Sequence, residues 1–191
     1  SLEGSLTALE SSSQLVEGEI DYYGDLIFDV DENGEFAEIK IESFSTTPVF
    51  NIGGSKERRG EWQIALSPEP ELLLNLDSGS GAVSYDLSNL RVGELILDVG
   101  SGAVALNLPA TSTFAGQIDG GSGALEITLP EQVGLRIELE DGSGSFRTDT
   151  RFVLVEGEPD DDGIWETKNY DTAEYQIDLE IDQGSGSVVI R

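Results

Sequence analysis

Hydrophobic and polar residues alternate along the central part of the chain in a pattern that repeats every 21 residues. Each repeat begins with Gly-Ser-Gly, at 79–81, 100–102, 121–123 and 142–144, and a fifth copy follows at 184–186. Alternation with a period of two predicts β-strands, because successive side chains of a strand point to opposite faces. A fixed period of this length is typical of solenoids, in which each unit buries its apolar face against its neighbours.

Two strands are expected in each repeat. The first follows the glycines, and its inward columns are Val83/Val104/Leu125/Phe146/Val188, Tyr85/Leu106/Ile127/Thr148/Ile190 and Leu87/Leu108/Leu129. The second closes the repeat, with columns Phe114/Leu135, Leu95/Ile137 and Leu97/Ile118/Leu139. Strands repeated in register stack as parallel ladders about 4.8 Å apart. The sequence therefore predicts an all-β fold, a parallel β-solenoid resembling a single-stranded β-helix, whose 21-residue coils form two packed sheets.

The glycines predict the corners of the coils, because a corner needs positive φ, which glycine adopts at little cost. The residue two before each first glycine is acidic in all five copies: Asp77, Asp98, Asp119, Glu140 and Asp182. We favour an interpretation in which these carboxylates accept hydrogen bonds from the backbone N–H groups that follow. The alternative is a ladder of cation sites, in which bound Ca²⁺ relieves repulsion between stacked carboxylates.

The composition changes along the chain and predicts one folded domain at 16–191. Residues 1–15 are rich in serine and lack periodicity, so we expect them to form a flexible tether. Within the domain we expect irregular N-terminal strands at 16–70 and regular coils at 71–144. Residues 145–191 are expected to form a coil with one inserted hairpin and a final strand.

Residues 16–44 predict hairpin strands, because apolar residues alternate on both sides of Asp31-Glu32-Asn33-Gly34. Asp29, Asp31 and Asn33 also match the first half of a calcium loop. Such a loop requires a glutamate at its twelfth position, which is Lys40 here, and we therefore favour the plain hairpin.

Two more strands are expected at Pro48–Ile52 and Glu61–Leu66. The basic cluster of the chain, at 53–60, joins them, and we favour a solvated turn over a docking loop. Trp62 follows on the second of these strands, where an aromatic side chain is more often part of the core than of a binding site.

The regular pattern is interrupted after the fourth Gly-Ser-Gly. The next core positions would be Glu156, Glu158 and Asp160, and acidic residues do not line a core. We therefore predict a projecting hairpin made of Phe152–Val155 and Ile164–Thr167. Its tip carries five carboxylates in seven residues at 156–162, a local candidate for Ca²⁺, although a solvated tip is favoured.

The final strand, Gly184–Arg191, is expected to leave an open sheet edge. Open edges present unpaired backbone groups, so a cap or a partner is expected there.

The net charge is −28, from 38 acidic and 10 basic residues. This charge excludes nucleic-acid binding by a basic face and disfavours adsorption to an anionic membrane. Two interpretations stay open: the charge keeps a β-protein soluble, or it reflects life in high salt or high Ca²⁺. The absence of cysteine and histidine excludes thiol and imidazole chemistry. The absence of methionine predicts that an upstream segment has been removed.

Three segments resemble the toastrack-type domains of bacterial cell-envelope proteins: Asp98–Pro109, Asp119–Leu125 and Lys168–Glu174. Such domains are often labelled adhesins, and similar ones form the C-terminal parts of cell-wall stress-response membrane proteins. The resemblance covers roughly 17–191. It implies an extracytoplasmic domain, membrane-anchored or at the cell surface, tethered by a segment outside this sequence. It implies no catalytic residues.

We therefore expect a non-enzymatic cell-envelope module, an adhesin or scaffold whose partner is an envelope protein or polysaccharide. No catalytic, cofactor-binding or metal-ligating residue is assigned, and membrane contact is expected only through an anchoring segment outside this sequence. One alternative is a calcium-dependent structural module. Another is a carbohydrate-active β-helix enzyme with paired carboxylates, but coils of 21 residues leave little space for a substrate groove.

Overall fold

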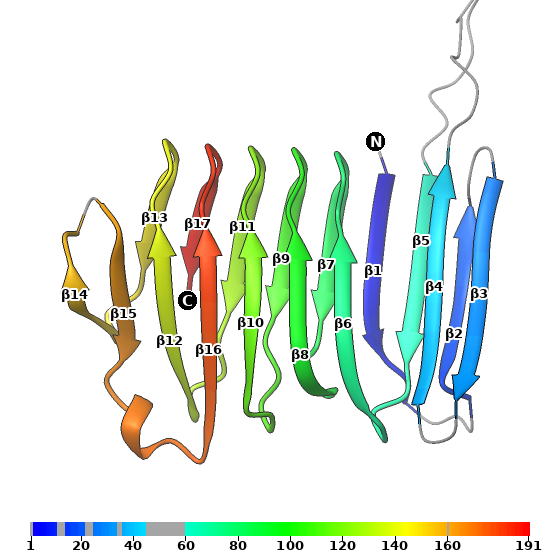
Figure 1. The fold of residues 1–191 in the computed structure, drawn as a ribbon, viewed down its shortest axis with the longest axis horizontal. Helices are drawn as coiled ribbons and strands as arrows, with labels where there is room; N and C mark the ends of the chain where they lie inside the picture. Colours follow the sequence, from blue (N-terminus) through cyan, green and yellow to red (C-terminus); the bar gives the residue numbers. More distant parts are fainter. Residues whose placement is uncertain (1, 11–13, 22–24, 34–35, 45–59, 160) are drawn as a thin grey trace, which may run out of the picture.

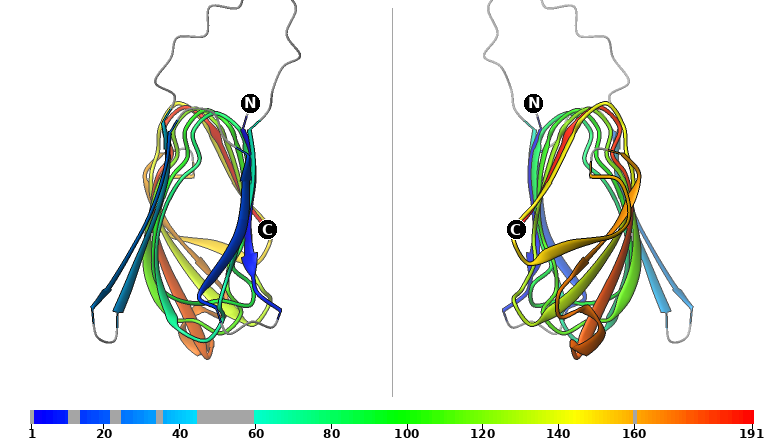
Figure 2. Two further views of the ribbon diagram at one scale, coloured as in Figure 1. Left: turned by 90° about the vertical axis from the view of Figure 1, so that its right-hand side faces the viewer. Right: turned by 90° about the vertical axis from the view of Figure 1, so that its left-hand side faces the viewer.

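The computed structural model describes residues 2–10, 14–21, 25–33, 36–44, 60–159 and 161–191. Two large sheets face each other as the walls of a flattened stack, and a hairpin of two nine-residue strands forms a separate sheet (Figures 1 and 2). The strands in the first third are β1 (Leu2–Ala8), β2 (Val16–Asp21), β3 (Asp25–Asn33), β4 (Phe36–Phe44) and β5 (Gly60–Leu66).

The other strands fall into two groups. Those of the repeats are β6 (Glu71–Asp77), β7 (Ala82–Asp86), β8 (Arg91–Asp98), β9 (Ala103–Asn107), β10 (Phe114–Asp119), β11 (Ala124–Thr128) and β12 (Val133–Glu140). Those of the C-terminal part are β13 (Ser145–Thr148), β14 (Phe152–Gly157), β15 (Gly163–Thr167), β16 (Tyr175–Asp182) and β17 (Ser187–Ile190), with the 3₁₀ helix η1 (Tyr170–Thr172) before β16.

The all-β prediction with parallel sheets is confirmed. The eight-stranded sheet has the order β13-β17-β11-β9-β7-β1-β5-β2, and the seven-stranded sheet has the order β14-β15-β12-β16-β10-β8-β6. Val83 pairs with Val104 and Val104 with Leu125, so neighbouring strands are offset by the 21 residues of the sequence repeat. The columns expected to point inward form the core between the sheets, and Leu87, Leu95, Leu106 and Ile137 have no exposed surface.

The position of the last strand corrects the sequence-based expectation. β17 lies between β11 and β13, and β16 lies between β10 and β12, so the final segment is inserted inside the stack (Figure 1). Ile177, Leu179 and Ile181 on β16 are buried, whereas Phe146 and Thr148 on β13 are only half-buried. The more apolar segment therefore takes the interior place, and the short, polar β13 takes the edge.

Residues 2–8 are not a tether. β1 is hydrogen-bonded in parallel to both β5 and β7, and Leu6 is buried. Leu2, Leu6 and Ala8 occupy alternate positions, as a strand with one buried face requires. Gly4 takes the remaining position of this pattern, so a count of apolar residues does not detect the strand. Gly4 is required because a Cβ atom there would lie 2.0 Å from the ring of Trp62.

The two tryptophans of the chain lie toward opposite ends of the core. Trp62 packs on Tyr85 with ring centroids 6.3 Å apart, and Trp165 packs on Phe146 at 5.7 Å. Both tryptophans contact the core and are half-buried, which agrees with the expected structural role of Trp62. Large aromatic rings thus cover apolar surface where the regular stacking stops.

The hairpin predicted at residues 16–44 is confirmed only for β3 and β4, which pair antiparallel from Asp25↔Phe44 to Asn33↔Phe36. β2 instead pairs antiparallel with β5, which confirms the strand expected at Glu61–Leu66. The expected turn glycine at 34, the expected strand Pro48–Ile52 and the basic cluster up to residue 59 lie outside the described residues.

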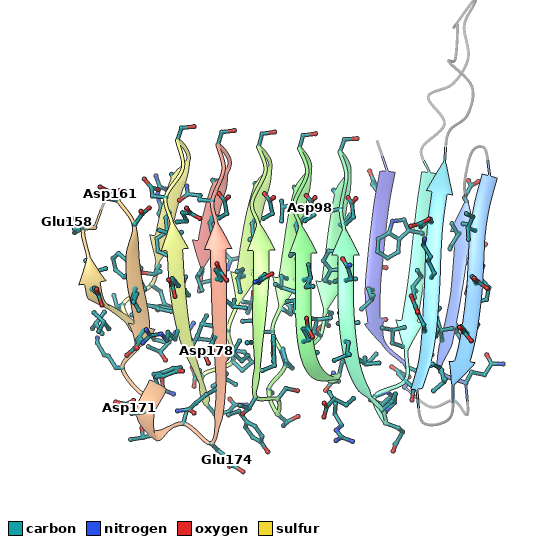
Figure 3. The ribbon with its side chains drawn as sticks, in the orientation of Figure 1. Asp98, Glu158, Asp161, Asp171, Glu174 and Asp178 are labelled. Atoms are coloured by element: carbon teal, nitrogen blue, oxygen red, sulfur yellow. The ribbon has the colours of Figure 1, made fainter. Side chains whose placement is uncertain are left out.

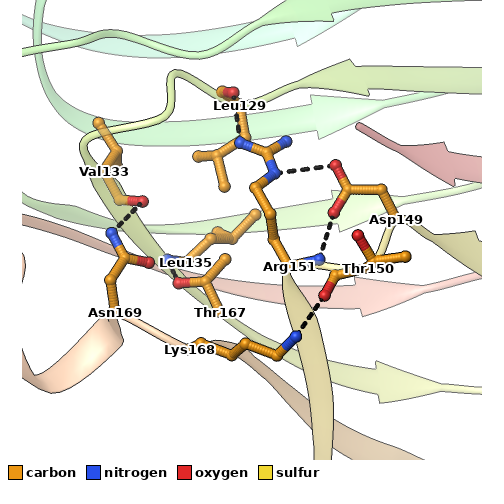
Figure 4. A network of polar contacts seen from close by, with 9 residues as sticks. All are labelled: Leu129, Val133, Leu135, Asp149, Thr150, Arg151, Thr167, Lys168 and Asn169. Carbon is orange, nitrogen blue, oxygen red and sulfur yellow. Dashed lines mark hydrogen bonds and ion pairs between the residues drawn. The ribbon is translucent and has the colours of Figure 1, made fainter.

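The predicted inserted hairpin is present as β14 and β15, but it does not project. β15 pairs antiparallel with β12, so the hairpin extends the seven-stranded sheet. Figure 4 shows the contacts that hold its base. The Arg151 guanidinium donates to Asp149 and to the carbonyl of Leu129, and the Lys168 ammonium donates to the carbonyl of Thr150.

Thr167→Val should lower the free energy of unfolding by about 1–3 kcal/mol, because it leaves a buried N–H group without an acceptor. The Thr167 hydroxyl, in a side chain 3% exposed, accepts a hydrogen bond of 3.0 Å from the backbone N–H of Leu135. Urea unfolding measures the change. The control is Thr172→Val, at an exposed residue, for which we expect less than about 0.5 kcal/mol. Equal losses in both variants would contradict this role of Thr167.

Candidate functional surfaces

The five acidic residues before the glycines form one continuous row, here called the acidic ladder. In spatial order they are Asp77, Asp98, Asp119, Asp182 and Glu140, each paired in register with the next across adjacent parallel strands. All five are exposed at the end of the seven-stranded sheet next to the corners (Figure 3 labels Asp98). Neighbouring members lie on adjacent strands, whose backbones are about 4.8 Å apart in the hydrogen-bonding direction, so their like charges repel.

Three members of the ladder have the expected turn role. The carboxylates of Asp77, Asp119 and Asp182 accept hydrogen bonds from the N–H groups of Gly79 (3.0 Å), Gly121 (3.4 Å) and Gly184 (3.2 Å). These glycines have φ of 57°, 49° and 63°. The turn interpretation is thus confirmed at three of the five positions, and it accounts for aspartate at each.

Asp98 differs, because the N–H of Gly100 donates to the Ser78 hydroxyl instead. Desolvation and the neighbouring charges of Asp77 and Asp119 raise the pKa of Asp98 above its ordinary value. The folded protein therefore holds this proton more tightly than the unfolded chain. The contribution of Asp98 to stability falls as pH rises from the ordinary carboxyl pKa through the raised one.

Asp98→Asn should raise the melting temperature by about 1–2 °C at neutral pH and low salt, because it relieves repulsion of about 0.5 kcal/mol with two neighbours. Differential scanning calorimetry measures the shift. The gain should shrink in acid, where Asp98 is protonated, and in high salt. Asp77→Asn is the matched control, because Asp77 lies on the edge strand β6 and has one ladder neighbour. A larger gain in the control would refute the explanation.

The acidic tip of the inserted hairpin makes local hydrogen bonds. The Asp162 carboxylate accepts a bond of 2.8 Å from the N–H of Asp141, and the Asp161 carboxylate accepts one from the N–H of Asp162. Figure 3 shows Glu158 and Asp161 at the outer end of this hairpin. Asp162 thereby joins the tip to the corner that follows β12.

Within the described ranges, no three acidic side chains are grouped closely enough to hold a metal ion. Asp29 and Asp31 lie in β3, paired with Lys40 and Glu38 of β4, as a hairpin requires. The calcium hypothesis stays a prediction.

The outer faces of the two large sheets differ in chemistry, a contrast that was not predicted from the sequence. The acidic face, on the outside of the seven-stranded sheet, carries the acidic ladder and two further rows from β8, β10, β12 and β16. Its other exposed acidic residues include Glu71, Glu94, Glu138, Asp178 and Glu180. A hollow of about 470 Å³ lies over Ala115 between these carboxylates.

The neutral face, on the outside of the eight-stranded sheet, consists largely of small uncharged side chains. One row across it runs Ala82, Ala103, Ala124, Ser187 and Ser145. A hollow of about 540 Å³ lies over this face near β1 and β5. The sequence does contain this contrast at the outward positions of the strands. In the strands of the eight-stranded sheet these positions are often Ala or Ser, and in those of the seven-stranded sheet they are often acidic.

No helix of the described residues has the length and apolar character needed to cross a membrane.

Comparison with known proteins identifies the family. A family model described as the N-terminal domain of toast_rack, DUF2154, matches residues 2–149. A crystal structure of a "putative cell adhesion protein" from Clostridium sporogenes ATCC 15579 is similar, with a TM-score of 0.81 and 25% identity over 98% of this chain and 86% of that chain. No curated protein matches. The chain belongs to the toast_rack N-terminal domain family.

Proposed function

We propose that this chain is a non-enzymatic interaction module of the cell surface, built as a β-solenoid of 21-residue coils. The observation that carries the proposal is its likeness, over 98% of its length, to a structure described as a "putative cell adhesion protein". The geometry supports it, because the inward columns fill the space between the sheets and the hollows described above lie on outer faces. Recognition therefore takes place on the outside of the rigid sheets, at their faces and edges.

The location proposed for this module is extracytoplasmic, with attachment to the membrane or the wall by a segment outside this sequence. The likeness to a structure described as a "putative cell adhesion protein" supports this location. The high acidic charge is compatible with it, because charge keeps an exposed β-protein soluble. Protease treatment of intact cells that carry the native protein tests it. Digestion without lysis supports the location, and protection until lysis contradicts it.

Binding of coated beads to intact cells and to purified wall polysaccharide tests the interaction role. Beads that carry the protein should bind one of these surfaces more than beads carrying an unrelated protein of equal negative charge. Ala105→Arg on the neutral face and Gln117→Arg on the acidic face locate the contact, because both side chains point outward at mid-strand. Binding no greater than that of the charge-matched control, on every surface tried, would contradict the proposal.

A further inference from the structure

Four strands end the two large sheets, and three of them carry features that discourage pairing with another chain. β2 presents Glu17, Glu19 and Asp21, β13 has only four residues, and β14 contains a bulge between Leu154 and Glu156. Charges, short length and bulges are the usual protections of sheet edges.

The fourth edge, β6, lacks these protections along its middle. Its seven residues include Leu72, Leu73, Leu74 and Leu76, and Leu73 is 68% exposed. β6 is hydrogen-bonded to β8 alone among the described strands. The register shift of this pair places the extra residue in β8, so β6 itself runs without a bulge. A regular apolar edge of this kind is a template for an added strand.

The two-stranded sheet creates a second unpaired edge on the same side of the molecule. β3 and β4 stand beyond β6, opposite β5 and β2, and β4 is hydrogen-bonded to β3 alone among the described strands (Figures 1 and 2). Phe28 and Val30 on β3 are 56% and 43% exposed. An isolated two-stranded hairpin is at best marginally stable in water, so this region gains most from added pairing.

The side chains around β6 define what an added strand must carry. Leu72 and Leu76 pack only partly against the core, so alternate residues facing inward should be apolar. On the outer side β6 presents Glu71 and Asp77 at its two ends, with Leu73 and Asn75 between them, and β8 adds Glu94 and Asp98. Residues facing outward should therefore be basic, in keeping with a chain of net charge −28.

We infer that the free edge of β6 binds, by strand addition, an extended segment of another protein in which apolar and basic residues alternate. Backbone hydrogen bonds to β6 supply affinity, and the alternating side chains supply specificity. The inference rests on the proposed function, since it names the class of partner that the interaction module takes and the place where it binds.

Fluorescence anisotropy with a fluorescein-labelled seven-residue peptide of alternating valine and lysine, matched to the seven residues of β6, tests this on the purified chain. We expect saturable binding at low salt and slowed hydrogen exchange of β6 amides. The same peptide N-methylated at every residue keeps the charge but has no backbone N–H group to donate on either edge, and it should not bind. Equal binding of the methylated peptide, or no binding of either, overturns the inference.

Two charge variants locate the site. Glu71→Lys on β6 should weaken peptide binding by at least about tenfold. Glu138→Lys makes the same charge change on the same outer face, four strands away, and should change binding by less than about twofold. Equal weakening would show diffuse attraction to the acidic face and overturn the inference. So would a dimer in sedimentation velocity that Glu71→Lys abolishes, because the edge would then belong to a second copy.

The peptide measurement separates this inference from the proposed function, because it uses neither cells nor envelope material. Peptide binding at β6 together with failed bead adhesion contradicts the proposed cell-surface role alone. If the beads adhere, Glu71→Lys does not reduce this adhesion and the peptide does not bind, then the β6 site is contradicted and the proposed cell-surface role is not.

Discussion

Gly102→Ala is expected to cost about 3 kcal/mol of unfolding free energy, or a fall of about 6–12 °C in melting temperature. A Cβ atom at Gly102 would lie 1.8 Å from the carbonyl oxygen of Gly81 in the neighbouring coil. The obstacle is backbone rather than a movable side chain, so the two coils must separate and lose hydrogen bonds. Thermal and urea unfolding measure the loss.

Gly79→Ala is the matched control within the same motif. Gly79 has φ of 57°, but a Cβ atom there meets nothing within 4 Å. The alanine is destabilising only because it must adopt the left-handed backbone conformation, which should lower the free energy of unfolding by about 1–2 kcal/mol. If Gly79→Ala proved as damaging as Gly102→Ala, close stacking would not be the reason for the second glycine.

A double cysteine variant, Ala124→Cys with Ser187→Cys, should form a disulfide that raises the free energy of unfolding by about 4 kcal/mol. The two residues pair in register across β11 and β17 and point to the neutral face. Adjacent strands bring Cα atoms within the range that a disulfide spans. The chain has no other cysteine, so thiol titration and unfolding with and without reductant report on this bond alone.

Ala124→Cys with Ser145→Cys is the control for strand order. In sequence order the coil of Ser145 follows that of Ala124, so simple stacking would make these residues neighbours. In the structure β17 separates β11 from β13, which places the two residues two strand spacings apart, about 9.6 Å. Bond formation in this control and not in the first variant would contradict the inserted position of the last segment.

The glycine findings refine the role expected for the repeated motif. Positive φ was expected at the corners, and it occurs at the first glycine of three motifs, Gly79, Gly121 and Gly184. At Gly100 and Gly142, and at the second glycines Gly102, Gly123, Gly144 and Gly186, φ is not positive, and a Cβ atom would collide with backbone of the adjacent coil. Most of these glycines are therefore needed for close approach between coils rather than for a left-handed turn.

Sequence by itself determined the strands of the repeats, their inward columns and the corners, because these follow from local periodicity and from glycine spacing. The columns through Val83, Tyr85 and Leu87 are buried as the alternation requires, except for Phe146 and Thr148 on the edge strand β13. The turn role of Asp77, Asp119 and Asp182 was equally local, because each carboxylate caps an N–H group two residues ahead. The inserted hairpin was found because Glu156 and Glu158 could not be core residues.

Only the tertiary structure decided which strands are neighbours. A parallel ladder accepts any strand with the right alternation, so pattern alone could not show that β16 and β17 enter the stack between the third and fourth Gly-Ser-Gly coils. The same limit hid β1, whose glycine is explained by Trp62 far along the chain. The order of the strands also decides which strand is an unprotected edge, here β6, and which residues form the acidic and neutral faces. Edges and faces are properties of the assembled sheets and not of single strands.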